Sequence, residues 1–310
     1  MRARVLVLIG LVACGGATTS EIDQKTSTTS GKGPATANPA PTTAAPSGMP
    51  IVDRVDFAGT GGIVYWTEGD APNGRVRAAR LDGTGIVTIA DAQFPTGVAV
   101  DVALSKVYWA DNVNDTISRA NLDGSAAEVL YTATDKLANP NGIAVDHAAG
   151  KMFWTESNVI KVAGLDGKSP TTIYTGKFPT GVSGVAGELA FTDNETDSMS
   201  LGNYTGAPPT EYTLSTDAFS NPSAVAIDTQ LFWAQSGGIF KMANDGSARV
   251  QIATAAFPGG VAIDSTSHRV YFTDNDTDTV AYVNADGSGR TVIYTASDRF
   301  ANPRGVAIRP

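Results

Sequence analysis

The chain has 310 residues, 42% of them hydrophobic, which suffices for one large domain or two small ones. Its 31 acidic residues outnumber its 22 Lys and Arg residues, and this balance argues against nucleic acid or an anionic membrane surface as the main partner. With one cysteine and two histidines, His147 and His268, an intramolecular disulfide is excluded, and a Cys/His metal site or histidine-based catalysis is disfavoured.

The first residues have the pattern of an export signal. Two arginines precede an apolar run, residues 5–13, which is too short to span a bilayer but has the length of a signal-peptide core. Residues 11–14 (Leu-Val-Ala-Cys) resemble the bacterial lipobox, which implies cleavage before Cys14 and lipid attachment to its thiol. An ordinary secretory signal with a chance cysteine is the alternative. By resemblance to enterobacterial sorting, Gly15 favours the outer membrane, so we expect an exported lipoprotein of the bacterial cell envelope.

Residues 14–50, from the lipidated cysteine onward, predict a tether. Thr, Ser, Ala, Gly and Pro dominate this segment, and large apolar side chains are almost absent. Such a chain buries too little surface to offset the entropy lost on folding, so we expect a disordered linker that holds a domain off a membrane.

From residue 51 onward, the chain repeats a motif of an aromatic pair, a small residue and an acid or amide. Successive copies are separated by 43, 45, 37, 42 and 39 residues, a period typical of propeller blades. An apolar run such as residues 97–100 (Gly-Val-Ala-Val) accompanies the motif, as does an Asp-Gly turn in every copy but the fourth. The six copies begin at Tyr65, Tyr108, Phe153, Ala190, Phe232 and Tyr271.

Each period predicts four short strands: the apolar inner strand, the aromatic strand, a third that leads into the Asp-Gly hairpin, and a β-branched fourth. Six copies predict an all-β, six-bladed β-propeller of four-stranded antiparallel blades over residues 51–310, which we expect to be a monomer. The first blade needs an inner strand from one terminus. Residues 55–57 and residues 305–308 are the alternatives, and the second matches the repeat better. Joining the two ends would remove an exposed sheet edge.

These repeats resemble the low-density lipoprotein receptor class B repeats, also called YWTD repeats, and all six copies contribute. The resemblance implies a six-bladed propeller with one binding face. Four copies depart from the pattern: the motif acid is Glu at positions 68 and 156 and Gln at 235, and Ala190 replaces the first aromatic residue. The chain also contains none of the cysteine-rich modules of the animal receptors. The ligands and the endocytic or signalling role of that family therefore do not transfer.

The blades alternate in two types. Three loops that enter inner strands are short and contain Phe-Pro, whereas the other three are longer and contain Asn-Pro. An Asp-Asn pair follows the aromatic motif only in the second, fourth and sixth blades. This alternation predicts three two-blade units related by pseudo-threefold symmetry.

Strand direction places the loops that enter the inner strands and the turns after the aromatic strands on one face, here called the top face. Apolar groups ringed by carboxylates and amides predict a binding surface there. The alternative is structural, because Asn-Pro and Asp-Asn are common turn formers. The candidate binding residues are Phe94, Asp111, Asn112, Asn141, Phe178, Asp193, Asn194, Phe257, Asp274, Asn275 and Arg304.

Residues 274–278 resemble the start of a calcium loop, but Gly is absent at its sixth position and Ala285 occupies its twelfth. We therefore predict no cofactor, with a weak Ca²⁺ site as the alternative. The four tryptophans recur with the blades, which predicts packing between blades rather than a ligand cage.

A binding or scaffold protein is the favoured function, with an unknown protein or glycan as ligand. Both histidines fall in turns at the opposite, bottom face, and no Ser-His-Asp set can be assembled. The alternative is a propeller enzyme, either a metal-dependent lactonase or lyase or a carboxylate-based glycan-active enzyme.

Overall fold

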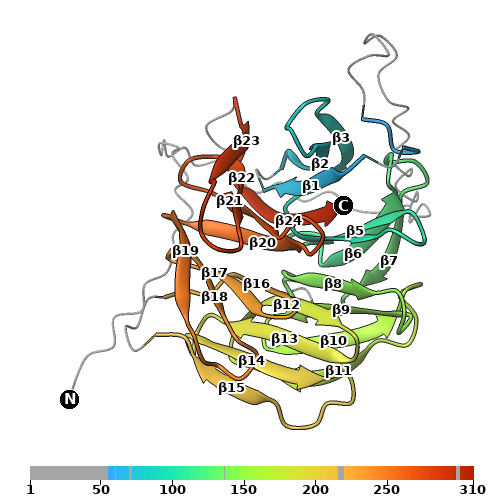
Figure 1. Cartoon of the computed structure of the whole chain (residues 1–310). Coiled ribbons are helices and arrows are strands. Elements are labelled where there is room, and N and C mark those ends of the chain that lie inside the picture. Colours follow the sequence, from blue (N-terminus) through green and yellow to red (C-terminus); the bar gives the residue numbers. More distant parts are fainter. Residues whose placement is uncertain (1–54, 60, 70–71, 136, 216–219, 298–300) are drawn as a thin grey trace, which may run out of the picture. The chain divides into compact units, whose positions relative to one another are not determined.

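The computed structural model describes residues 55–59, 61–69, 72–135, 137–215, 220–297 and 301–310. Their 24 strands form six four-stranded sheets in which every paired neighbour is antiparallel. The sheets are the blades of a ring (Figure 1), and this confirms the predicted six-bladed propeller. Cys14 and the predicted signal peptide and linker lie outside the described residues. Within the described part of the chain, no helix has the length and hydropathy of a membrane span.

Each blade runs from an inner strand near the ring axis to an outer fourth strand. Blades 1 and 2 contain β24 (Pro303–Arg309), β1 (Ile63–Glu68), β2 (Gly74–Arg80) and β3 (Val87–Ala92), then β4 (Pro95–Asp101), β5 (Lys106–Asp111), β6 (Thr116–Asn121) and β7 (Glu128–Thr132). Blades 3 and 4 contain β8 (Ile143–Asp146), β9 (Lys151–Glu156), β10 (Val159–Gly164) and β11 (Thr171–Thr175), then β12 (Pro179–Val185), β13 (Glu188–Asp193), β14 (Ser198–Asn203) and β15 (Thr210–Thr213). Blades 5 and 6 contain β16 (Ala224–Ile227), β17 (Leu231–Gln235), β18 (Gly237–Met242) and β19 (Val250–Ala255), then β20 (Pro258–Asp264), β21 (Arg269–Asp274), β22 (Thr279–Asn284) and β23 (Thr291–Thr295).

The aromatic strand is the second of each blade and is buried on both of its faces, because neighbouring blades pack against it from either side. Trp66, for example, is fully buried in one cluster with Tyr271 and Val280 of blade 6. Trp154 and Trp233 are equally buried in clusters that join other pairs of blades. The tryptophans therefore pack between blades, as predicted, and burying such large side chains contributes much of the stabilising energy.

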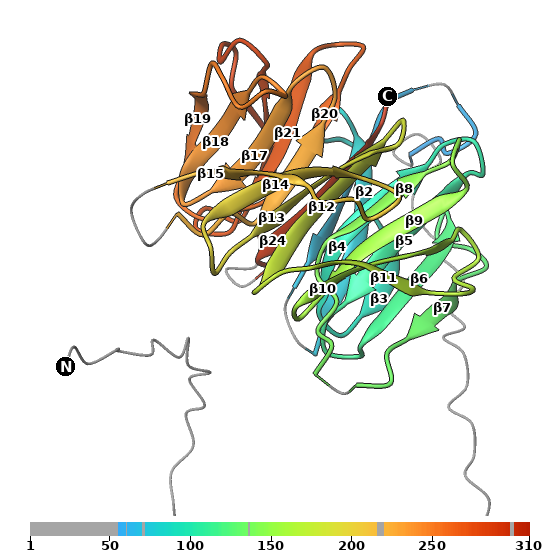
Figure 2. The ribbon, with the colours of Figure 1, turned by 90° about the horizontal axis from the view of Figure 1, so that it is seen from below.

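The C-terminal strand closes the ring. β24 pairs with β1, from Ile63 opposite Arg309 to Glu68 opposite Pro303, and Figures 1 and 2 show the two ends of the described chain side by side. The C-terminal alternative for the first inner strand is thus confirmed. Arg309 also donates to the carbonyl oxygens of Phe57 and Gly61, each at 2.7 Å, so that it holds the segment that precedes β1.

Glycines let the inner strands approach one another closely around the axis. A Cβ atom on Gly142 would lie 2.5 Å from the carbonyl oxygen of Thr180, and one on Gly181 would lie 2.6 Å from the Cα of Ala224. Gly97, Gly260 and Gly305 meet the backbone of their neighbouring blade in the same way. The repeated glycine therefore marks backbone contact between blades, which any side chain would push apart.

Candidate binding site on the top face

The top-face turns of blades 2, 4 and 6 share the pattern Asp-Asn-x-x-Asp, and the first aspartate binds the Phe-Pro loop of its own blade. Asp111 accepts hydrogen bonds from the backbone N–H groups of Gln93 at 2.8 Å and Phe94 at 3.2 Å. It also accepts from the backbone and side-chain N–H groups of Asn114. Asp193 and Asp274 bind the N–H groups of Phe178 and Phe257 in the same way.

This geometry gives three of the candidate binding residues a structural role. Asp111, Asp193 and Asp274 are buried, with exposed fractions of 2%, 5% and 2%. Their carboxylate oxygens already accept backbone hydrogen bonds, which is the arrangement expected of buried carboxylates. These acids therefore hold the loops that form the face, and the prediction that they also bind a ligand stays a prediction.

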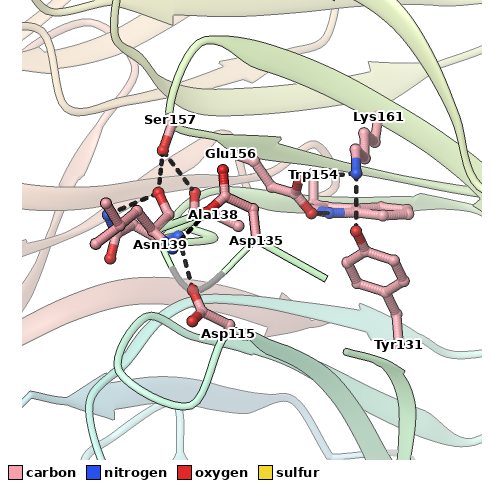
Figure 3. A network of polar contacts seen from close by, with 10 residues as sticks. Asp115, Tyr131, Asp135, Ala138, Asn139, Trp154, Glu156, Ser157 and Lys161 are labelled. Carbon is pink, nitrogen blue, oxygen red and sulfur yellow. Dashed lines mark hydrogen bonds and ion pairs between the residues drawn. The ribbon is translucent and has the colours of Figure 1, made fainter. Parts of the chain in front are cut away.

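The last aspartate of the same turn binds the following blade. Asp115 accepts a hydrogen bond from the backbone N–H of Asn139 at 2.9 Å (Figure 3), and Asp197 and Asp278 do the same for Asn221 and Asn302. All six of these residues have positive φ values between 43° and 55°, a conformation that Asp and Asn tolerate better than most residues. The turn thus fastens the Asn-Pro loop of the neighbouring blade.

Blades 1, 3 and 5 use a different internal contact. In blade 3, the indole N–H of Trp154 donates to Glu156, and Lys161 bridges Glu156 and the hydroxyl of Tyr131 in blade 2 (Figure 3). Trp66 donates to Glu68 in blade 1, and Trp233 donates to Gln235 in blade 5. The motif acid of these blades is therefore a buried indole acceptor, which explains why Gln serves equally well in blade 5.

The top-face loops of all six blades surround a central pocket with a volume of about 270 Å³. Five candidate binding residues line it: Asn141, Asn194, Phe257, Asn275 and Arg304. The rest of its wall consists mainly of inner-strand Gly, Val and Thr residues, together with Asn221, Ser223 and Ser236. The structure therefore brings these five residues together, and it leaves the candidates Phe94, Asn112 and Phe178 outside the lining.

Phe94, Asn112 and Phe178, the candidates outside the pocket, lie in three different environments. Phe94 lies beneath Arg304, whose guanidinium carbon is 4.3 Å from the centroid of the aromatic ring. Phe178 is 46% exposed, and Phe257, its equivalent in blade 6, is 62% exposed. Asn112 is half-buried, and its backbone N–H donates to the carbonyl of Phe94. The three Phe-Pro loops thus occupy equivalent places in their blades, but Arg304 covers the Phe94 ring whereas the Phe178 and Phe257 rings are exposed.

Arg304 is the one charged side chain among the described residues that line the pocket. Its Nε is buried, and no hydrogen-bond partner for it is found within the described residues. Burial lowers the pKa of the Arg304 guanidinium from its ordinary value, because desolvation disfavours the charged form. Asn275 presents a second buried polar atom, its Oδ1, that lacks a partner within the same part of the chain.

The two histidines lie in turns that follow inner strands, away from the central pocket. His147 contacts Asp101 at 3.1 Å, and His268 lies in a turn beside Asn284 and Asp286. Across the described ranges, no three Asp, Glu, His or Cys side chains are grouped to hold a metal ion. In the turn at residues 274–278, Asp274 and Asp278 accept backbone N–H groups.

Sequence reasoning missed the role of Asp115, Asp197 and Asp278, each of which fastens its blade to the loop that enters the next blade. The signal was present, because Asp-Asn-x-x-Asp occurs at residues 111–115, 193–197 and 274–278. It also missed the motif threonines: Thr67, for example, donates to the carbonyl of Thr96 in blade 2 and accepts from the N–H of Gly305.

Repeats, blades and closure together define the chain as a six-bladed β-propeller. Residues 105–147 match the family model for the low-density lipoprotein receptor repeat class B. The chain is 34% identical over 89 residues to low-density lipoprotein receptor-related protein 5 of Mus musculus, and 39% identical over 64 residues to nidogen of Drosophila melanogaster. These matches cover 27% and 20% of this chain, and 5% of each relative.

Solved structures share the fold. A chain of the nidogen/laminin complex superimposes with a TM-score of 0.68 and 21% identity, covering 80% of this chain and 98% of that one. A catalytically inactive histidine variant of virginiamycin B lyase from Staphylococcus aureus, solved with quinupristin, gives a TM-score of 0.54 at 20% identity over 68% of this chain and 73% of the lyase. At these identities the likeness establishes the fold alone.

Proposed function

We propose that this propeller is a binding module that presents its top face to a protein partner. The observation that carries the proposal is the central pocket, which all six blades line with amide, hydroxyl and apolar groups around one unpaired arginine. Concave sites of this kind, mostly apolar with a few convergent polar groups, are typical of ligand recognition. A structural relative of this chain was solved in a complex of two proteins, nidogen and laminin, which favours a protein over a glycan as the partner.

The enzyme alternative is less well supported, although the structure of virginiamycin B lyase shares the fold. Acid–base catalysis needs a titratable group within reach of the reacting atoms. The lining of the central pocket, as far as the structure describes it, contains no Asp, Glu, His, Lys, Cys or Tyr. The carboxylates that sequence reasoning assigned to this face are buried and bonded to backbone N–H groups. A binding function needs none of these groups.

We also propose that a lipid on Cys14 anchors the propeller to the cell envelope through residues 14–50. The support is the lipobox-like sequence that ends at the sole cysteine of the chain. Metabolic labelling with an alkyne-tagged fatty acid tests this directly. The full chain should take up the label and sediment with membranes, and Cys14→Ala should do neither. A labelled Cys14→Ala chain would contradict the anchor without affecting the binding proposal.

Site-specific photo-crosslinking tests the binding proposal. A photoreactive phenylalanine analogue at Phe257 or Phe178 should capture the same partner protein in intact cells. The control positions are Leu104, which is 43% exposed in a bottom-face turn, and Ile86, which is exposed beside the Asp82 turn. Capture from the top positions alone supports the proposal. Equal capture from Leu104 and Ile86, or no capture from either phenylalanine position, would overturn it.

A further inference from the structure

One position on the top face breaks the pseudo-threefold symmetry in a way that the fold does not require. The residue after each Asn-Pro pair is Asn141 in blade 3, Ser223 in blade 5 and Arg304 in blade 1. All three line the pocket, and each lies at the start of the inner-strand segment of its blade. Since small neutral residues occupy this position twice, folding does not explain a long charged side chain at the third.

Two further departures from the symmetry lie against this same arginine. Gly69 stands where blades 3 and 5 have Ser157 and Ser236, and a Cβ atom on it would lie 2.5 Å from Arg304 Nε. Gly259 stands where blades 2 and 4 have Thr96 and Thr180, and a Cβ atom there would lie 2.9 Å from Arg304 Cα. Gly69 and Gly259 therefore leave two positions beside Arg304 without a side chain.

The arginine is held in place without being neutralised. Its guanidinium lies over the ring of Phe94, with its carbon 4.3 Å from the ring centroid, in a cation–π contact. No ion pair or side-chain hydrogen bond joins it to any described residue. Removing a cation from water without giving it an opposite charge raises the free energy of the folded state. Such a group is matched by an anion that arrives from outside, and Arg is suited to bind a carboxylate through two parallel hydrogen bonds.

We infer that Arg304 is the recognition residue for a carboxylate of the partner, presented by an Asp or Glu side chain that enters the central pocket. This inference rests on the proposed function. The pocket supplies one positive charge and, among its described lining residues, no second charge of either sign. That balance fits a singly charged carboxylate better than a doubly charged phosphate. Asn141, Asn194 and Asn275 are placed to pair with the polar backbone of the inserted segment, and Phe257 contributes an exposed apolar rim.

The direct test compares matched small probes on the full chain. N-acetyl-aspartate methylamide and N-acetyl-asparagine methylamide differ only in the carboxylate, and ligand-observed NMR reports their affinities. We expect the aspartate probe to bind about tenfold or more tightly than the asparagine probe, because a charge-assisted bidentate pair is lost with the amide. Methyl glucuronide and methyl glucoside form a second pair with the same difference in charge.

Three variants make the test specific. Arg304→Ser introduces the residue of the equivalent position 223, so the fold should tolerate it, and it should abolish the preference for the aspartate probe. Gly69→Ser introduces the residue of blades 3 and 5, and it should weaken the preference by displacing Arg304 without touching the probe. Lys168→Ser removes the same charge from an exposed bottom-face turn and should leave the preference unchanged.

The outcomes separate this inference from the proposed function. Equal affinity for the aspartate and asparagine probes, or no binding of either, overturns the inference, as does a preference that survives Arg304→Ser. An Arg304-dependent preference shown only by the glucuronide identifies an acidic glycan and overturns the protein carboxylate. If Arg304→Ser leaves capture from Phe257 undiminished, the top face binds a partner but Arg304 does not recognise it. If neither phenylalanine position captures a partner in the chain that keeps Arg304, the binding function itself is overturned.

Discussion

Asp115 Oδ1 lies 2.9 Å from the backbone nitrogen of Asn139, and this hydrogen bond joins blade 2 to the loop that enters blade 3. The carboxylate is buried, and Asp115 itself has a φ of 55°. The same pair occurs between Asp197 and Asn221 at 2.9 Å. Each bond joins a buried carboxylate to a backbone N–H of the next blade, so we expect these bonds to stabilise the ring.

Asp115→Ala should therefore lower the free energy of unfolding by about 2–3 kcal/mol, because it removes a charged acceptor from a buried N–H and places Ala at a positive φ. Asp115→Asn should cost less, about 1 kcal/mol, since Asn keeps an acceptor and tolerates the backbone conformation. Urea unfolding measures both. Asp82→Ala, in an exposed bottom-face turn, is the control. A loss at Asp82 as large as that at Asp115 would refute the role of the blade-to-blade bond.

Gly142→Ala should destabilise the ring at its axis. The new methyl group would lie 2.5 Å from the carbonyl oxygen of Thr180 and 3.0 Å from the nitrogen of Val182, both backbone atoms of blade 4. Blades 3 and 4 must then separate, and overpacking of this kind typically costs about 1–3 kcal/mol. Thermal unfolding by calorimetry provides the measurement.

Gly61→Ala is the matched control, because a Cβ atom there meets nothing within 4 Å. That change should leave stability the same or raise it by about 0.4–1 kcal/mol through the unfolded state. Similar melting temperatures for the two variants would show that the inner strands move apart freely.

The periodicity of Tyr65, Tyr108 and their equivalents was enough to predict blade number and strand order, because each repeat buries the same positions. It left two alternatives for the closing strand, and the pairing of β24 with β1 decides between them. The site was predicted only in part. An Asp-Asn turn looks exposed in sequence, and nothing local reveals that Asp111 turns inward to bind residues 93 and 94. The contact of Arg304 with Gly69 and Phe94 depends on ring closure, which brings together residues from opposite ends of the domain.

Stability should fall with alkaline pH through Tyr294. Burial, together with the neighbouring charge of Glu68, raises the pKa of Tyr294 from 10.0 to about 12. The folded state then holds its proton at pH values where the unfolded chain has released it. The stabilising contribution is complete below about pH 10 and is lost as the pH rises towards 12.

Tyr294→Phe should be less stable than the unaltered chain at pH 8, because it lacks the 2.9 Å hydrogen bond from the tyrosine hydroxyl to Glu68. The gap between the two chains should narrow between pH 10 and pH 12. Urea unfolding across that range measures the gap, and tyrosinate absorbance follows the titration. A constant gap would mean that Tyr294 does not titrate as its surroundings imply.

Arg309 should stabilise the segment that precedes β1, next to the strand pairing that closes the ring. It is 6% exposed, and its guanidinium donates to the carbonyl oxygens of Phe57 at 2.7 Å, Gly59 at 3.1 Å and Gly61 at 2.7 Å. Arg309→Met keeps most of the apolar stem but leaves these oxygens without their donor. The expected cost is about 2–4 kcal/mol, as for other broken buried networks. Lys168→Met, at an exposed turn, should have almost no effect.

Removing residues 303–310 tests the same closure at the level of the strand. Without β24, the backbone groups of β1 from Ile63 to Glu68 lose their partners, and an open edge of this kind pairs readily with other chains. Light scattering should show the truncated chain associating at concentrations where the full chain and Arg309→Met do not. A truncated chain that stays monomeric and melts at the temperature of the full chain would show that the ring holds without its closing strand.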